Sequence, residues 1–82
     1  MDNAKVIREF VISNFLYGDS AVLTDDTSFL ESGIIDSTGM LELITFLENT
    51  FHTRIQPEEM VAENLDSVSQ VASFLSRKLV PA

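Results

Sequence analysis

The sequence predicts an all-α fold: a four-helix bundle with three longer helices, a short third helix and a long first loop. Apolar residues recur at helical spacing in three separate stretches, and cap or stop residues bound each stretch. No two stretches form a convincing strand pair. Because 82 residues suffice for one small domain, we expect a single domain over residues 1–82, with its core at about 3–80.

The first predicted helix spans about residues 5–17. Its apolar side comprises Ile7, Phe10, Val11 and Phe15, opposite Lys5, Arg8, Glu9 and Ser13. Asp2 or Asn3 can cap its start, and Gly18 is a natural C-terminal stop. From residue 19 to 36 the helical pattern is absent, and turn residues alternate with apolar anchors. We therefore expect a long loop whose apolar residues pack against the core.

The second predicted helix spans about residues 36–51 and is the strongest helical signal in the chain. Asp36 and Ser37 stand at its start, where both residue types are favoured caps. Its apolar stripe comprises Met40, Leu41, Ile44, Leu47 and Phe51, opposite Glu42, Thr45, Asn49 and His52. We expect this stripe to face the core.

The last third of the chain predicts a short helix and a longer one. Pro57 stands at a first helical position and is followed by two acids, which marks the start of a short helix near residues 57–61. Ser67 and Gln70 fit a capping box that opens the last helix. The buried stripe of that helix comprises Val68, Val71, Ala72, Leu75 and Leu79, and its C-terminus carries Arg77 and Lys78, where positive charge is favoured.

Composition excludes several classes of function. The chain has 13 acidic and 5 basic side chains, a formal net charge of −8 and no cysteine. The charge argues against nucleic-acid binding, whose affinity comes largely from neutralised phosphates; it favours basic protein surfaces as partners, or simply solubility. Without cysteine there is no thiolate zinc site, and one histidine cannot form a histidine-based metal cage. Carboxylates could still bind a hard cation, but we expect no metal site. A signal peptide and a long apolar segment are both missing, so we expect a cytoplasmic protein with no membrane insertion.

The stretch from Gly33 to Gly39 is the most informative for chemistry. Two isoleucines lead into Asp36 and Ser37 at the start of the longest helix. The simplest interpretation of this pair is a helix cap. Glycine in a first helical turn costs up to about 1 kcal/mol relative to alanine, so we interpret Gly39 as room for the close approach of another surface. A helix N-terminus also favours phosphate, which makes Ser37 well placed to carry a phosphodiester.

This stretch resembles the phosphopantetheine attachment region of acyl and peptidyl carrier proteins. The resemblance rests on residues 29–37 (FLESGIIDS) with residues 40–43 (MLEL) downstream, and it extends over nearly the whole chain, including residues 64–68 (NLDSV). It implies an acyl-carrier-like bundle and a covalent 4′-phosphopantetheine cofactor, taken from coenzyme A and attached to Ser37. A separate magnesium-dependent transferase would attach it, with Asp36 helping to present the serine. The terminal thiol of the arm would carry cargo as a thioester.

The resemblance also implies surfaces for partners and cargo. The implied partner-binding residues are Thr38, Met40, Leu41, Glu42, Glu48, Glu58 and Glu59, although each acid is equally readable as an ordinary solvated residue. We predict that cargo can lie in an apolar groove near Leu47, Met60 and Val61. Thr38 and Gly39 depart from the fatty-acid-synthesis pattern, in which a leucine and an acid are common. They are more similar to D-alanyl carriers and other discrete carriers of dedicated pathways.

Other motifs support weaker interpretations. Residues 36–39 have one residue too many between Asp and Gly for an aspartic protease loop, which also belongs to a β-rich fold. Asp25-Asp26 lacks the spacing of an EF-hand calcium loop, so these acids are expected to cap a turn. His52 is interpreted as a surface residue. Ser37 has no nearby histidine base in the sequence, so we expect no catalytic residue in this chain.

The predicted function is delivery rather than catalysis. We expect a carrier that shuttles acyl or aminoacyl intermediates between enzymes of a dedicated fatty acid or secondary metabolite pathway. Its expected partners are a phosphopantetheinyl transferase, a loading ligase and downstream transferases or synthases, and we expect a monomer. Fatty acyl, hydroxyacyl, aminoacyl and aryl cargo all remain open. The alternative is a small acidic helical adaptor without a prosthetic group, on which Ser37 is a phosphorylation site.

Overall fold

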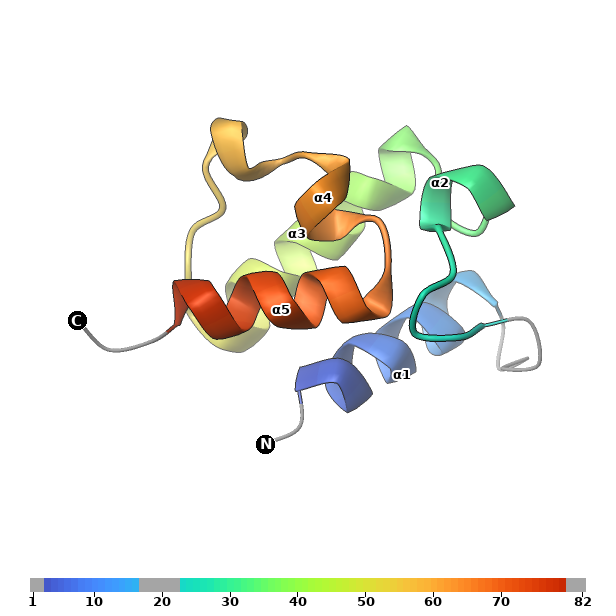
Figure 1. The fold of residues 1–82 in the computed structure, drawn as a ribbon, viewed down its shortest axis with the longest axis horizontal. Helices are drawn as coiled ribbons and strands as arrows, with labels where there is room; N and C mark the ends of the chain where they lie inside the picture. Colours follow the sequence, from blue (N-terminus) through green and yellow to red (C-terminus); the bar gives the residue numbers. More distant parts are fainter. Residues whose placement is uncertain (1–2, 17–22, 80–82) are drawn as a thin grey trace.

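The structure, a computed structural model, describes residues 3–16 and 23–79, and all regular elements in these ranges are helical (Figure 1). The elements are α1 (Asn3–Phe15), α2 (Phe29–Ser32), α3 (Ser37–Phe51), the 3-10 turn η1 (Pro57–Glu59), α4 (Ala62–Leu65) and α5 (Val68–Lys78). The three longer helices α1, α3 and α5 confirm the predicted all-α bundle.

Two parts of the expected helix pattern differ in the structure. The single short helix expected near residues 57–61 is replaced by two pieces, η1 and α4, and the expected first loop contains the additional short helix α2. Asp2, Tyr17 and Gly18, which were assigned to the ends of the first helix, lie outside the described residues. Within the described ranges, no helix has the length and apolar character needed to cross a membrane.

The core is formed by apolar side chains from all five α-helices and from the segments between them. α5 packs against both α1 and α4, as Figure 1 also shows. The buried apolar residues are Ile7, Val11, Leu23, Phe29, Ile35, Leu43, Ile44, Leu47, Ile55, Leu65, Val68, Val71, Phe74 and Leu75. Segments remote in sequence thus share one continuous core, as a chain of this size requires.

α3 presents a face to the core that the sequence pattern predicted only in part. Ile44 and Leu47 are buried as expected, but Leu41 is 62% exposed, whereas Leu43 is fully buried. At about 100° per residue, Leu41 and Leu43 lie about 200° apart around the helix, so burying one side exposes the other. Leu41 therefore lies outside the buried side of α3, because packing against neighbouring helices selects the side of Leu43.

Side chains cap α3 and α5 as the sequence predicts. The carboxylate Oδ1 of Asp36 accepts a hydrogen bond from the Gly39 amide at 2.7 Å, which satisfies one of the free donors at the start of α3. The Ser67 hydroxyl accepts from the Gln70 amide at 3.1 Å at the start of α5. α3 ends at Phe51 and is followed by the C-cap His52, which adopts a left-handed conformation with φ of 53°.

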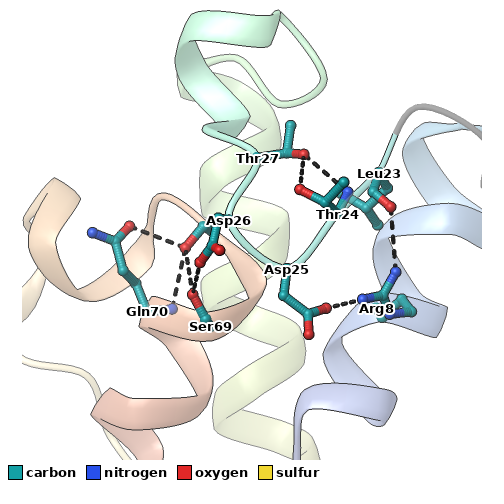
Figure 2. A network of polar contacts seen from close by, with 9 residues as sticks. Arg8, Leu23, Thr24, Asp25, Asp26, Thr27, Ser69 and Gln70 are labelled. Atoms are coloured by element: carbon teal, nitrogen blue, oxygen red, sulfur yellow. Dashed lines mark hydrogen bonds and ion pairs between the residues drawn. The ribbon is translucent and has the colours of Figure 1, made fainter.

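The segment before α2 is held between α1 and α5 (Figure 2). The Arg8 guanidinium forms an ion pair with the Asp25 carboxylate and donates to the Leu23 carbonyl at 3.3 Å. Across from it, the Ser69 amide donates to the Asp25 carbonyl at 2.9 Å, and the Ser69 hydroxyl donates to Asp26 Oδ1 at 2.8 Å. These two acids lie in a turn, as predicted, and they also connect that turn to α1 and α5.

Candidate functional site

The segment that leads into α3 is fixed by backbone hydrogen bonds to the short helix α2. Gly33 caps the C-terminus of α2 with a φ of 79°, a left-handed conformation that favours glycine. The following Ile35 is 1% exposed and donates its amide hydrogen to the Phe29 carbonyl at 3.2 Å. The direction in which the chain enters α3 is therefore set by a glycine turn and a buried isoleucine.

Asp66 supports the same segment from across the molecule. Its Oδ1 accepts from the Leu30 amide at 3.0 Å, its Oδ2 accepts from the Ser28 hydroxyl, and its carbonyl accepts from the Phe29 amide at 2.8 Å. The start of α2 is thus capped partly by a residue 36 positions away. This role of Asp66 was missed, because the sequence places it only within the stretch before the last helix.

Ser37 is exposed and is the first residue of α3. Asp36 satisfies the amides of Gly39, through its carboxylate, and of Met40, through its carbonyl at 2.8 Å. The amides of Ser37 and Thr38 have no acceptor within the helix, because they lie in the first turn of α3 and the residues four positions earlier precede it. The serine hydroxyl therefore stands at a helix N-terminus whose remaining donors and dipole favour an anionic group.

Gly39 is buried, and the surface that approaches it belongs to this chain. A β-carbon built at this position would lie 2.8 Å from Phe15 Cε1 and 3.1 Å from Ile35 Cγ2. The glycine therefore provides room for the end of α1. Packing within the molecule thus explains the small residue, which the sequence alone had suggested was room for another surface.

The residues predicted to meet partners divide into two groups. Thr38, Leu41 and Glu42 are exposed beside Ser37, and Met40 is half-buried next to them. These residues share one end of α3 with the serine. They form a surface of mixed apolar and acidic character that a partner can reach together with Ser37.

The other predicted partner residues lie farther along the chain, and two of them have structural partners. Glu48 Oε2 accepts from the Ile55 amide at 2.9 Å. Glu59 accepts from the Gln56 amide and forms an ion pair with Lys78, each at 2.8 Å. The hydrogen bond from Lys78 lowers the pKa of Glu59 below its ordinary value of 4.5. Glu58 is exposed on η1.

Of the residues predicted to line a cargo groove, one is buried in the core and two are exposed. Leu47 is fully buried in the core, whereas Met60 is 41% and Val61 43% exposed. The structure places a different hollow, of about 480 Å³, between α1 and α3, and its apolar walls include Phe10, Leu41 and Phe46. A second hollow of about 320 Å³ lies at the start of α3. From its helical spacing Phe10 was assigned only to the core, and no sequence pattern singled out Phe46.

The phosphopantetheine attachment site family matches residues 7–75 of this chain. The chain belongs to this family. It is a carrier protein of the acyl and peptidyl carrier class, and carriers of this class hold a covalently attached 4′-phosphopantetheine. They are modified by phosphopantetheinyl transferases, interact with loading and synthase enzymes, and are generally not catalysts themselves. The family resemblance and the cofactor predicted from residues 29–43 are thereby confirmed.

A solved structure supports the same fold. A chain in the structure titled "Crystal structure of FAD-dependent dehydrogenase" is 26% identical to this carrier protein and superimposes with a TM-score of 0.75. The match covers 84% of this chain and 97% of that chain. The helical arrangement is therefore shared over nearly all of that chain.

The residues at the start of α3 fit a phosphopantetheine group. Attachment requires a hydroxyl that an enzyme can reach, and Ser37 is exposed. A phosphodiester carries negative charge, which suits the N-terminus of the fifteen-residue helix α3. The carboxylate of Asp36 is bonded to the Gly39 amide, which holds it in the cap rather than against the serine. Within the described residues, no cluster of potential metal ligands is present.

Proposed function

We propose that Ser37 is the phosphopantetheine attachment residue of this carrier protein, and that the chain delivers acyl or aminoacyl thioesters between enzymes of a dedicated pathway. The observation that carries this proposal is the exposed serine at the first position of α3, within the matched family region. We further propose that the chain is a monomer without catalytic activity of its own.

Attachment is a substitution at phosphorus for which this chain supplies the nucleophile. The Ser37 oxygen forms a bond to the β-phosphorus of coenzyme A, adenosine 3′,5′-bisphosphate leaves, and the hydroxyl proton passes to a base of the transferase. The cap at Asp36 and the buried Ile35 hold the serine backbone in one orientation before the reaction. The positive end of the α3 dipole stabilises the added phosphodiester charge.

The bound arm supplies a terminal thiol that carries cargo as a thioester, a group that a chain without cysteine cannot provide from its own side chains. The residues of this chain bind partners and orient the arm. Leu41, which is 62% exposed, can fill an apolar pocket on a partner, while Glu42 can pair with a basic residue. Contacts at the start of α3 would thus select the transferase, a loading ligase and downstream enzymes.

Intact-mass measurement after enzymatic modification tests this proposal. The purified protein is incubated with coenzyme A, magnesium and a promiscuous phosphopantetheinyl transferase. We expect a mass gain of one phosphopantetheine that is absent in Ser37→Ala. Ser69→Ala is a matched control, because Ser69 is the second residue of α5 and lies outside the site. Failure of several active transferases to modify the folded wild-type protein would favour the adaptor alternative.

Asp36 variants separate capping from recognition. Asparagine also caps helices, so Asp36→Asn should keep the stability of the wild type, whereas Asp36→Ala should lose about 1 kcal/mol. If the transferase reads the carboxylate charge, Asp36→Asn slows modification without unfolding the protein. Equal modification rates for wild type and Asp36→Asn would limit this residue to a capping role.

A further inference from the structure

The hollow between α1 and α3 has apolar walls that no other part of the described structure covers. Phe10 and Phe46 stack with ring centroids 4.0 Å apart and an interplanar angle of 14°, and Leu41, which is 62% exposed, lines the hollow with them. The volume of about 480 Å³ falls in the range of small-molecule sites. Exposed apolar surface of this kind gains free energy when a ligand covers it.

Two polar side chains of the hollow are bonded to their own helices. Asn14 Nδ2 donates to the Phe10 carbonyl at 2.9 Å, and Thr45 Oγ1 donates to the Leu41 carbonyl at 3.0 Å. These donors therefore have an acceptor without any ligand. An apolar group can enter without stripping them of hydrogen bonds.

The hollow is continuous with the attachment site. Thr38, the neighbour of Ser37, lines both this hollow and the smaller one at the start of α3, and so do Asn14 and Glu42. The lining residues of α3 extend from Thr38 to Asn49, which is about 16 Å along the axis at 1.5 Å per residue. A flexible arm on Ser37 can thus fold back along α3 and place its end against the stacked rings of Phe10 and Phe46.

The charge around the hollow limits what can occupy it. Among the described residues that line it, Glu42 is the only ionisable one, and none is basic. A carboxylate on the cargo would meet an acid without a compensating cation. The walls therefore suit uncharged apolar groups, and the stacked rings suit an aryl group in particular.

We propose that this hollow binds the uncharged aryl or apolar acyl end of cargo carried on Ser37. This inference rests on the proposed attachment to Ser37 and replaces the groove predicted near Leu47, Met60 and Val61. Tethering favours cargo over a free partner as the occupant, because a group attached one residue from Thr38 has a high effective concentration at the hollow.

Amide-linked arms provide the test, because they are not hydrolysed during measurement. Phenylacetyl-pantetheine and succinyl-pantetheine are each attached to Ser37 from their coenzyme A analogues, and intact mass confirms loading. The amide NMR shifts of each protein are then compared with those of the protein carrying the bare arm. We expect the phenylacetyl group to shift Phe10, Leu41, Thr45 and Phe46 and to show contacts with the Phe46 ring, and the succinyl group to leave these residues unchanged.

Thr45→Arg and Thr50→Arg form a matched pair of variants. Both positions are exposed on α3, but only Thr45 lines the hollow. We expect Thr45→Arg to abolish the phenylacetyl-dependent shifts and Thr50→Arg to retain them. A circular dichroism spectrum like that of the wild type shows that each variant is folded.

The remaining outcomes distinguish cargo from a second copy of the chain as the occupant of the hollow, and they separate this inference from the proposed attachment to Ser37. Loaded protein whose shifts cluster at Met60 and Val61, or show no cargo-dependent change, overturns this inference and leaves Ser37 attachment intact. Shifts that disappear on dilution assign the hollow to a second copy of the chain and also overturn it. Absence of any mass gain on Ser37 overturns both this inference and the proposed function.

Discussion

Gly39 connects the candidate site to the core, because the Phe15 ring occupies the space that a β-carbon would need. Phe15 in turn makes an edge-to-face contact with Phe10, and Phe10 stacks on Phe46. A residue in the first turn of α3 is thus linked through three aromatic rings to the hollow between α1 and α3. A change at Gly39 is therefore expected to alter stability.

Gly39→Ala should lower the free energy of unfolding by about 1 kcal/mol, because overpacking outweighs the gain in helix propensity. Urea denaturation measures this change. The exposed neighbour provides the control: Thr38→Ala should leave stability equal or slightly higher, since alanine favours helix. Adding Phe15→Leu should relieve part of the Gly39→Ala effect. Strictly additive losses in the double variant would contradict contact between these two residues.

Among the short elements, α2 shows how a side chain remote in sequence can hold the chain segment that precedes Ser37. Asp66 accepts from the Leu30 amide and the Ser28 hydroxyl, so the entry to α2 depends on the segment before α5. α2 then leads through Gly33 to α3. The short helix could not persist alone, because four residues are too few for a helix to be stable in water.

Asp66→Ala should destabilise the protein by about 1–2 kcal/mol, the loss expected for a cap that satisfies more than one donor. The transferase should also modify Ser37 more slowly in this variant, because the chain before α3 is held less firmly. Urea denaturation and the initial rate of mass gain give the two readouts. Glu63→Ala, an exposed residue on α4, serves as the control and should change neither. Wild-type stability of Asp66→Ala would contradict its role as a cap.

The contact between η1 and the end of α5 should respond to pH. The hydrogen bond from Lys78 keeps the pKa of Glu59 below its ordinary value of 4.5 in the folded protein. A folded-state pKa below the unfolded one means that ionised Glu59 contributes stability above about pH 4.5, and that this contribution is lost as pH falls through the folded value.

Glu59→Gln should therefore be less stable than the wild type at neutral pH. The difference in the free energy of unfolding between the two proteins should become smaller as the pH falls below about 4.5. Urea midpoints measured across this range test the expectation. Glu58→Gln, the exposed neighbour on η1, is the matched control and should not show the same narrowing. If the difference in urea midpoint between the wild type and Glu59→Gln stays constant with pH, this ion pair does not contribute to stability.

At the scale of the whole molecule, the formal net charge of −8 favours encounter with basic surfaces. Part of that charge lies beside Ser37 at Glu42, whereas Glu48 and Glu59 are engaged in contacts that stabilise the fold. Glu42 is therefore available to a partner, whereas Glu48 and Glu59 stabilise the fold. Only exposed ones are suitable for charge-reversal experiments on recognition.

Glu42→Lys should slow modification of Ser37 about threefold at low salt, in line with the loss of a favourable exposed charge pair. Glu63→Lys changes the net charge equally but lies on α4, and it should have a smaller effect. The difference between the two variants should shrink as salt screens exposed charges. Initial rates of mass gain at two ionic strengths provide the measurement, and equal rates for both variants would argue against recognition through Glu42.

Much of the fold follows from patterns between near neighbours. The caps Asp36 and Ser67 were predicted because a side-chain oxygen reaches an amide three residues ahead whatever the surrounding fold. The three longer helices were predicted because each has an apolar face of helical period. The family, and with it the cofactor, followed from the residues around Ser37.

Other features depend on which remote residues meet, so no local pattern could reveal them. The sequence by itself determined the helical class, the starts of α3 and α5 and the place of Ser37 at one of these starts, because these depend on contacts within a turn or two. Only the tertiary structure decided that Leu43 rather than Leu41 is buried, that Asp66 caps α2, and that Phe15 requires a glycine at residue 39. It also formed the hollow beside the stacked rings of Phe10 and Phe46, because packing brings α1 beside α3.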